Sequence, residues 1–159
     1  MIQHFFHSVR SCITALFALG LAATMPLHAA TADYNLPANK LAIQGYDPVA
    51  YFTQSKAVPG SASFKTQHDG VTYYFSSAQT LAEFQAAPAK YLPTYGGWCA
   101  TAMAKGEKVE IDPTNFKVTN GRLFLFFNAW YGDAKKIWLK DEAVQEKKAD
   151  TNWKKISGE

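Results

Sequence analysis

The sequence predicts an α+β fold, in one small domain with two β-hairpins that are each followed by helix. Two turn signals predict the hairpins: Asp-Gly in "ASFKTQHDGVTYYFSS" and Asn-Gly in "FKVTNGRLFLFF", each between aromatic or β-branched runs. A third observation predicts the closing helix, because apolar residues recur at helical spacing after Asp133, namely Ala134, Ile137, Trp138 and Val144. No internal repeat stands out in the sequence.

The first 32 residues have the pattern of a cleaved secretory signal peptide. Arg10 precedes an apolar run over residues 13–25, which is too short to span a bilayer as a stable helix. Cleavage is expected after Ala32, which completes an Ala-x-Ala pattern, or alternatively after Ala29. No later stretch is long and apolar enough to cross a membrane. We therefore expect a periplasmic or secreted protein, with a lead-in over residues 33–44 and one domain over residues 45–156.

In the first half, each segment carries a local signal. The segment "GYDPVAYF" predicts a proline-fixed turn and then a short aromatic strand. In the first hairpin, Val71, Tyr73 and Phe75 alternate onto one face of the second strand. Ser76 stands three residues before Gln79, which predicts a capping box at the start of a helix.

In the second half, "WCATAMAK" predicts a short helix between two glycines. The strand after Asn-Gly is apolar on both faces, so it must be covered twice. One face carries Leu123, Leu125 and Phe127, and the other carries Phe124 and Phe126. Asp133 is expected to cap the closing amphipathic helix, whose end docks through Trp153.

Charge and motifs exclude several classes of function. A net charge of +3 is too mild to argue for nucleic acid as a partner, and export makes nucleic acid a still poorer fit. The sequence has no Gly-x-Ser-x-Gly, His-Glu-x-x-His, P-loop or dinucleotide-binding motif. The residues leave open whether the chain is an enzyme, and they favour a binding protein.

Sulfur chemistry gives the sharpest candidate site. Removal of the leader leaves Cys99 as the only cysteine and His68 as the only histidine, so an intramolecular disulfide is impossible. Cys99 and Met103 are four residues apart in the predicted short helix, so their sulfurs should lie on one face. Thiolate and thioether are soft donors that suit Cu(I), with the His68 imidazole as a third ligand. The candidate metal site is therefore Cys99, Met103 and His68, with copper as the cofactor.

Two alternatives stay open beside the copper site. In one, Cys99 is an inert buried residue, Met103 fills the core, and the protein is an interaction module that docks an exported protein through exposed aromatic rings. In the other, Cys99 is a single redox-active thiol, because unpaired N–H groups at the start of a helix stabilise a thiolate. Self-contained disulfide exchange is excluded, since the sequence has no Cys-x-x-Cys.

Several short motifs resemble the YHS domain, in the right order along residues 45–153: "YDPVAYF", "HDGVTYYFSS" and "LAEFQAAPAKYLP". The segment "YGGWCATAMAKGEKVEIDPTNFKVTNGRLFLFFN" resembles the extension found in the exported bacterial subgroup of that family. The resemblance implies a small α+β fold of the kind that holds a metal ion in some family members, here with a C-terminal helical extension. Metal-binding members have cysteines where this chain has Ala50, Ser76 and Thr80, so their cysteine-rich site does not carry over.

Overall fold

The structure is a computed structural model that describes residues 33–158, so the predicted signal peptide over residues 1–32 lies outside the described residues. Its 3₁₀ helices are η1 (Ala42–Gly45), η2 (Pro88–Lys90) and η3 (Thr94–Gly97). Its α-helices are α1 (Ala50–Thr53), α2 (Ala78–Ala86), α3 (Ala100–Met103), α4 (Ala134–Trp138) and α5 (Glu142–Ser157). Its strands are β1 (Ser61–His68), β2 (Val71–Phe75), β3 (Asp112–Thr119), β4 (Arg122–Phe126), β5 (Asn128–Ala129) and β6 (Gly132–Asp133).

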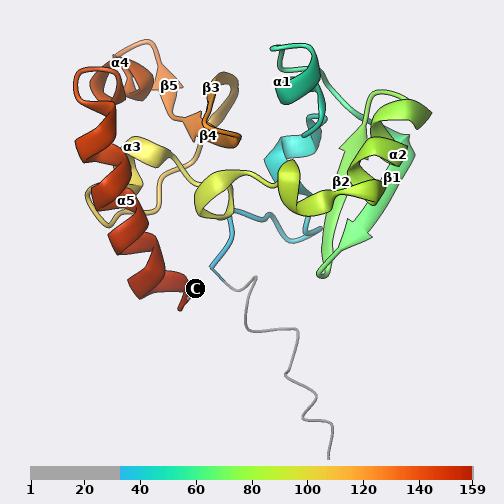
Figure 1. Cartoon of the computed structure of the whole chain (residues 1–159), viewed down its shortest axis with the longest axis horizontal. Helices are drawn as coiled ribbons and strands as arrows, with labels where there is room; N and C mark the ends of the chain where they lie inside the picture. Colours follow the sequence, from blue (N-terminus) through green and yellow to red (C-terminus); the bar gives the residue numbers. More distant parts are fainter. Residues whose placement is uncertain (1–32, 159) are drawn as a thin grey trace, which may run out of the picture.

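Three antiparallel hairpins and short helices form one small domain, which confirms the predicted α+β class. The hairpin β1–β2 lies with α2 at one end of the molecule, and β3–β4 lies with α3, α4 and α5 at the other (Figure 1). The third hairpin, β5–β6, is not predicted by the sequence. Among the described helices, none has both the length and the apolar character that crossing a membrane requires.

The two long hairpins have the same register and the same irregularity. His68 pairs with Val71 beside the first turn, as Thr119 pairs with Arg122 beside the second. Both hairpins then slip in the first strand: between Ser61 and Lys65 in β1, and between Asp112 and Phe116 in β3. The backbone of the second hairpin therefore repeats that of the first.

The repeat extends to the segment before each hairpin. η1 contains the left-handed run Ile43, Gln44 and Gly45, with φ of 49°, 52° and 86°, and η3 contains Tyr95, Gly96 and Gly97, with φ of 57°, 60° and 86°. Each of these turns follows a residue that bridges in parallel to the second strand of its hairpin, Leu41 to Thr72 and Pro93 to Leu123. The two halves therefore share backbone conformation and register rather than residue identity, so this repeat is not visible in the sequence.

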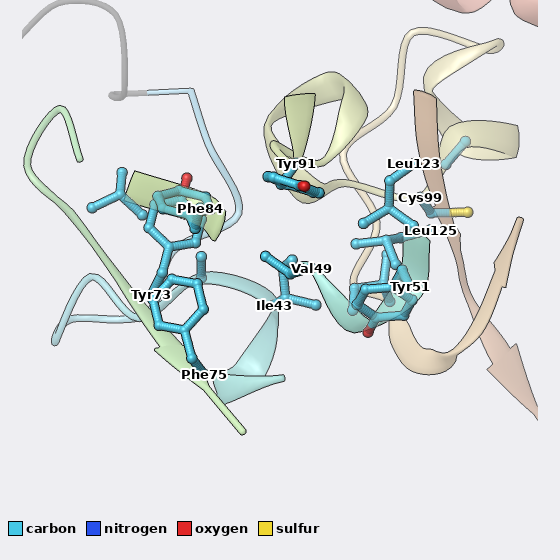
Figure 2. Close-up of a cluster of buried hydrophobic side chains, with 14 residues drawn as sticks. Ile43, Val49, Tyr51, Tyr73, Phe75, Phe84, Tyr91, Cys99, Leu123 and Leu125 are labelled. Carbon is cyan, nitrogen blue, oxygen red and sulfur yellow. The ribbon is translucent and has the colours of Figure 1, made fainter. Parts of the chain in front are cut away.

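β4 is buried on both faces, as its sequence predicts. Leu123 and Leu125 belong to a core cluster that reaches across to the first half, and Phe124 and Phe126 belong to a second cluster with Trp138 and the C-terminal helices. These four side chains of β4 are completely buried. Figure 2 shows the first cluster running from Tyr73 and Phe84 through Ile43 and Val49 to the leucines of β4. One continuous core therefore joins the two halves.

The predicted strand in "GYDPVAYF" is wrong, because residues 50–53 form α1. One oxygen of the buried Asp47 carboxylate accepts hydrogen bonds from the Val49 and Ala50 backbone N–H groups, and these bonds favour a helical turn. The predicted capping box of Ser76 and Gln79 is wrong, because the N-cap of α2 is Ser77 and the Gln79 amide donates to Glu83. Ser77 caps α2 by accepting a bond from the Thr80 N–H, while Ser76 binds Asp47.

The closing helix begins after the predicted cap, Asp133, whose carboxylate accepts from the Lys135 N–H. It is divided at residues 139–141 into α4 and α5, so the expected single apolar stripe does not form. Trp138 is completely buried and Trp153 is nearly so, as predicted, but Ile137 and Val144 are 45% and 44% exposed. The break turns the two aliphatic side chains out of the core.

The η3 turn holds both ends of the described chain. The Asn35 backbone N–H donates to the Gly96 carbonyl at 2.9 Å, and its side-chain amide donates to the Gly97 carbonyl at 3.2 Å. A Cβ at Gly96 would lie 2.7 Å from the Tyr34 ring and 2.8 Å from the Trp153 ring. Gly96 thus leaves the space in which these two rings meet.

The repeated turns give a matched prediction. Gly70 and Gly121 have φ of 77° and 72°, and an added Cβ would meet nothing within 4 Å at either position. Gly70→Ala and Gly121→Ala should each lower the free energy of unfolding by about 1 kcal/mol, through backbone strain alone. Gly132→Ala is the control, because its φ is not left-handed and its surroundings are equally open. Urea unfolding measures all three, and unequal losses at the two turns would contradict their equivalence.

Candidate binding pocket at Cys99

The Cys99 and Met103 side chains lie in different core clusters. Cys99 is 1% exposed and packs with Leu125, whereas Met103 is completely buried in the cluster of Phe124 and Trp138. Their separation has a backbone cause. Cys99 is the N-cap of α3, with ψ of 118°, so it stands outside the helix and the helical i to i+4 spacing does not apply to it.

His68 lies in the other half of the molecule, at the end of β1. Its Nε2 is 3.4 Å from an Asp69 carboxylate oxygen, and its ring contacts Phe84 edge-on at 6.0 Å between centroids. The structure therefore does not gather the three predicted ligands at one point. Within residues 33–158, no group of three or more histidine, cysteine, aspartate or glutamate side chains is arranged to hold a metal ion.

The thiol also lacks the helix that the redox alternative invokes. α3 has only four residues, so few peptide dipoles align behind Cys99. The side chain is almost fully buried, and burial slows attack by an oxidant or a disulfide. The placement of Cys99 therefore lends no support to a single-thiol redox role.

In the first half of the chain, a buried carboxylate lies at the junction between the segment that follows η1 and the β1–β2 hairpin. Asp47 is 0% exposed. Its Oδ1 accepts from Val49 N and Ala50 N at 2.9 and 3.4 Å, and its Oδ2 accepts from the Ser76 N–H and hydroxyl at 2.8 and 2.7 Å. This Asp47 junction ties the start of α1 to the end of β2, beside two positions where metal-binding relatives are expected to carry cysteine.

Cys99 occupies the same place in the second half. Its backbone N–H donates to the Val109 carbonyl at 3.0 Å, just as the Asp47 N–H donates to the Val58 carbonyl at 2.9 Å. Phe127 follows β4 as Ser76 follows β2. A thiol and a phenyl ring cannot form the polar bridge that Asp47 and Ser76 form, and the Cys99 junction stays open as a pocket.

The pocket has a volume of about 250 Å³ and lies between α3 and the β5–β6 hairpin. Cys99 and Ala102 form part of its wall, together with Val109, Phe127, Tyr131 and Ile137. In Figure 2 the Cys99 sulfur points away from Leu125 and Tyr51. Most of the lining is apolar, so the pocket can take an apolar group out of water.

Polar groups around the pocket are already engaged. The Thr101 hydroxyl donates to the Ala134 carbonyl at 2.8 Å. The Asp133 carboxylate accepts from the Asn115 amide at 2.8 Å, a bond that holds the pKa of Asp133 below its usual value. Over the described part of the chain, no buried side-chain nitrogen or oxygen lacks a hydrogen-bond partner. An occupant therefore has no buried polar group to satisfy.

An aromatic row runs from the pocket to the surface. The Phe127 and Tyr131 rings are 5.7 Å apart, and the Tyr131 and Trp130 rings meet edge-on at 5.2 Å. Trp130 is 96% exposed, at the tip of the β5–β6 hairpin. The sequence does not predict where these rings lie, because the two-residue strands that display them have no periodic signal. The Trp-Tyr-Gly run before Asp133 is the one available hint.

Comparison with known families finds one match. Residues 49–95 match the family model of the YHS domain, which covers the first hairpin and ends within η3. Neither the curated proteins nor the solved structures contain a match. The second hairpin, the Cys99 pocket and the C-terminal helices all lie outside the matched residues.

The Asp47 junction gives a stability prediction. Asp47→Ala should lower the free energy of unfolding by at least about 3 kcal/mol, because it leaves buried N–H and hydroxyl donors without an acceptor. Ser76→Ala keeps the backbone bond to Asp47 and should cost about 1 to 2 kcal/mol. The control is Glu83→Ala, which removes an exposed hydrogen bond to Gln79. If Asp47→Ala unfolds at the same denaturant concentration as the wild type, Asp47 does not hold the junction together.

Proposed function

Because residues 49–95 of the chain form a YHS domain, we propose that this protein is an exported YHS-like protein that acts by binding rather than by catalysis. Its binding site, in this proposal, is the Cys99 pocket in the second half of the chain. The partner is an exported protein that inserts an apolar side chain. Export, to the periplasm or beyond the cell, is proposed from the leader pattern in residues 1–32.

One observation carries the proposal: an apolar pocket that continues outward into an exposed aromatic ring. Trp130 at 96% exposure and Tyr131 at 67% keep apolar surface in water, which is costly unless a partner covers it. Trp and Tyr are also the residues that carry most binding energy at protein interfaces. The satisfied polar groups beneath them favour a partner that brings an apolar side chain.

Indole, the ring of a tryptophan side chain, tests the pocket directly. We expect indole to bind the protein with a roughly millimolar Kd, as a small apolar ligand should. In a heteronuclear NMR titration, the amide signals of Ala102, Val109 and Phe127 should shift together. Added indole should also slow the labelling of Cys99 by a thiol reagent.

Ile137→Lys should abolish this binding, because Ile137 lines the pocket and the charge would project from its wall. Its control is Leu139→Ala, since Leu139 is 52% exposed and does not line the pocket. Shifts confined to other surfaces, or equal affinity in wild type and Ile137→Lys, would refute the pocket as the site.

A second candidate is copper handling. The YHS domain is associated with metal handling, copper in particular, and the Cys99 thiol lines an open pocket. The proposed ligands of Cu(I) are Cys99, Met103 and His68. Because Met103 and His68 lie apart from the thiol, a site made of all three would require the chain to rearrange.

Titration of the reduced protein with Cu(I) against a competing chelator tests the copper site. If the thiol is a ligand, Cys99→Ser should weaken binding by at least about 100-fold, because a hydroxyl is a poor donor for a soft ion. Met103→Leu keeps the packing volume and separates a role as ligand from a role in the core. Equal affinity in wild type and Cys99→Ser would eliminate copper binding at this residue.

A further inference from the structure

The Cys99 pocket lies next to a side chain that projects from the surface. The pocket has a volume of about 250 Å³, and Phe127, Tyr131 and Ile137 form part of its wall. The projecting side chain is Trp130, which is next to Tyr131 in the chain and contacts its ring edge-on. A two-fold symmetric dimer needs one patch that contains both complementary shapes, because each copy presents the same surface to the other.

The charges around the pocket have both signs. The charged residues in its lining are Lys105, Glu107 and Asp133, one cation and two anions. Lys136 lies just outside the pocket lining, with its Nζ 4.0 Å from the Asp133 carboxylate. Such a rim does not attract the anionic surface of a membrane, which binds clusters of unpaired basic residues. It fits a partner whose rim also has both signs, because each charge can then face its opposite.

We propose that the occupant of the pocket is Trp130 of a second copy of this chain, so that two copies dimerise by exchanging these side chains reciprocally. The inference rests on the proposed function and names the partner of the same site. Each copy supplies one ring and one pocket, and the aromatic rows of the two copies become covered together. In the dimer, the partner's Trp130 fills the pocket that each Cys99 lines.

Sedimentation velocity from about 1 µM to about 1 mM protein tests the dimer, because this range covers the affinities of weak to moderate homodimers. The wild type should shift from monomer to dimer within this range. Trp130→Ala should raise the dimer Kd by at least about 30-fold, the loss expected for a central tryptophan. Leu139→Ala, an exposed apolar residue outside the pocket, should leave it unchanged.

Mixing two variants tests the reciprocal geometry. Trp130→Ala keeps the pocket and lacks the ring, whereas Ile137→Lys keeps the ring and lacks an apolar pocket. Neither variant should dimerise alone. Their mixture should form a heterodimer through one intact contact, weaker than the wild-type dimer that has two. Circular dichroism of each variant confirms that it is folded before mixing.

Three results would overturn the dimer. They are a wild type that stays monomeric to about 1 mM, a dimer that survives Trp130→Ala, and two variants that do not associate when mixed. Binding of monomeric protein to phosphatidylglycerol vesicles through Trp130 would also overturn it, in favour of a lipid surface. Indole binding in a protein that never dimerises would leave the pocket as the site and remove only the second copy as its partner.

Discussion

The complete burial of β4 on both faces is the constraint on which this fold depends. Leu123 and Leu125 face the core shared with the first hairpin, and Phe124 and Phe126 face Trp138. Each of these side chains contributes roughly 1.5 to 3 kcal/mol when it is fully buried, so neither half of the molecule can be removed without exposing one face. The same constraint separates Cys99 from Met103, because the segment around α3 sends one side chain to each side of the strand.

The two junctions between turn and hairpin use opposite chemistry at the same backbone position. A buried carboxylate such as Asp47 is tolerated only when its oxygens accept hydrogen bonds, and the four bonds from Val49, Ala50 and Ser76 close that junction. A buried thiol makes no such demand. Cys99 can therefore line an open pocket without a partner, and this difference sets the family-matched half apart from the half that follows it.

The strong local signals of the sequence predict much of the fold. Asp-Gly and Asn-Gly turns, the alternation of Val71, Tyr73 and Phe75, and the two apolar faces of β4 all appear as expected, because each depends on neighbouring residues. The strand predicted at residues 50–53 is wrong because Asp47 accepts from the Val49 and Ala50 N–H groups and so starts a helical turn, which the aromatic pattern of the segment does not reveal. The backbone repeat cannot be seen in the sequence, because different residues form the matching turns η1 and η3.

The candidate site is less predictable than the fold. The sequence selects Cys99 as a candidate site residue, but assigning its partners requires knowing whether it lies inside α3, and it lies one residue outside. The pocket is built from three separate segments, around residues 99–109, 127–134 and Ile137, and no spacing rule joins them. The exposure of Trp130 depends on a hairpin of two-residue strands that sequence patterns do not register.

The contacts at η3 include residues that directly follow the predicted signal peptide. Asp33 accepts a bond from the Trp98 indole through its carbonyl and pairs with Lys108 through its carboxylate, while Tyr34 and Trp153 meet over Gly96. Proteolytic processing after Ala29 or Ala32 would preserve all of these bonds, but removal of residues 33–35 would delete the contacts of Asp33 and Tyr34. The new amino terminus would then be an integral part of the scaffold rather than a disposable tail, and the exact point of cutting would influence how firmly the last helix is anchored.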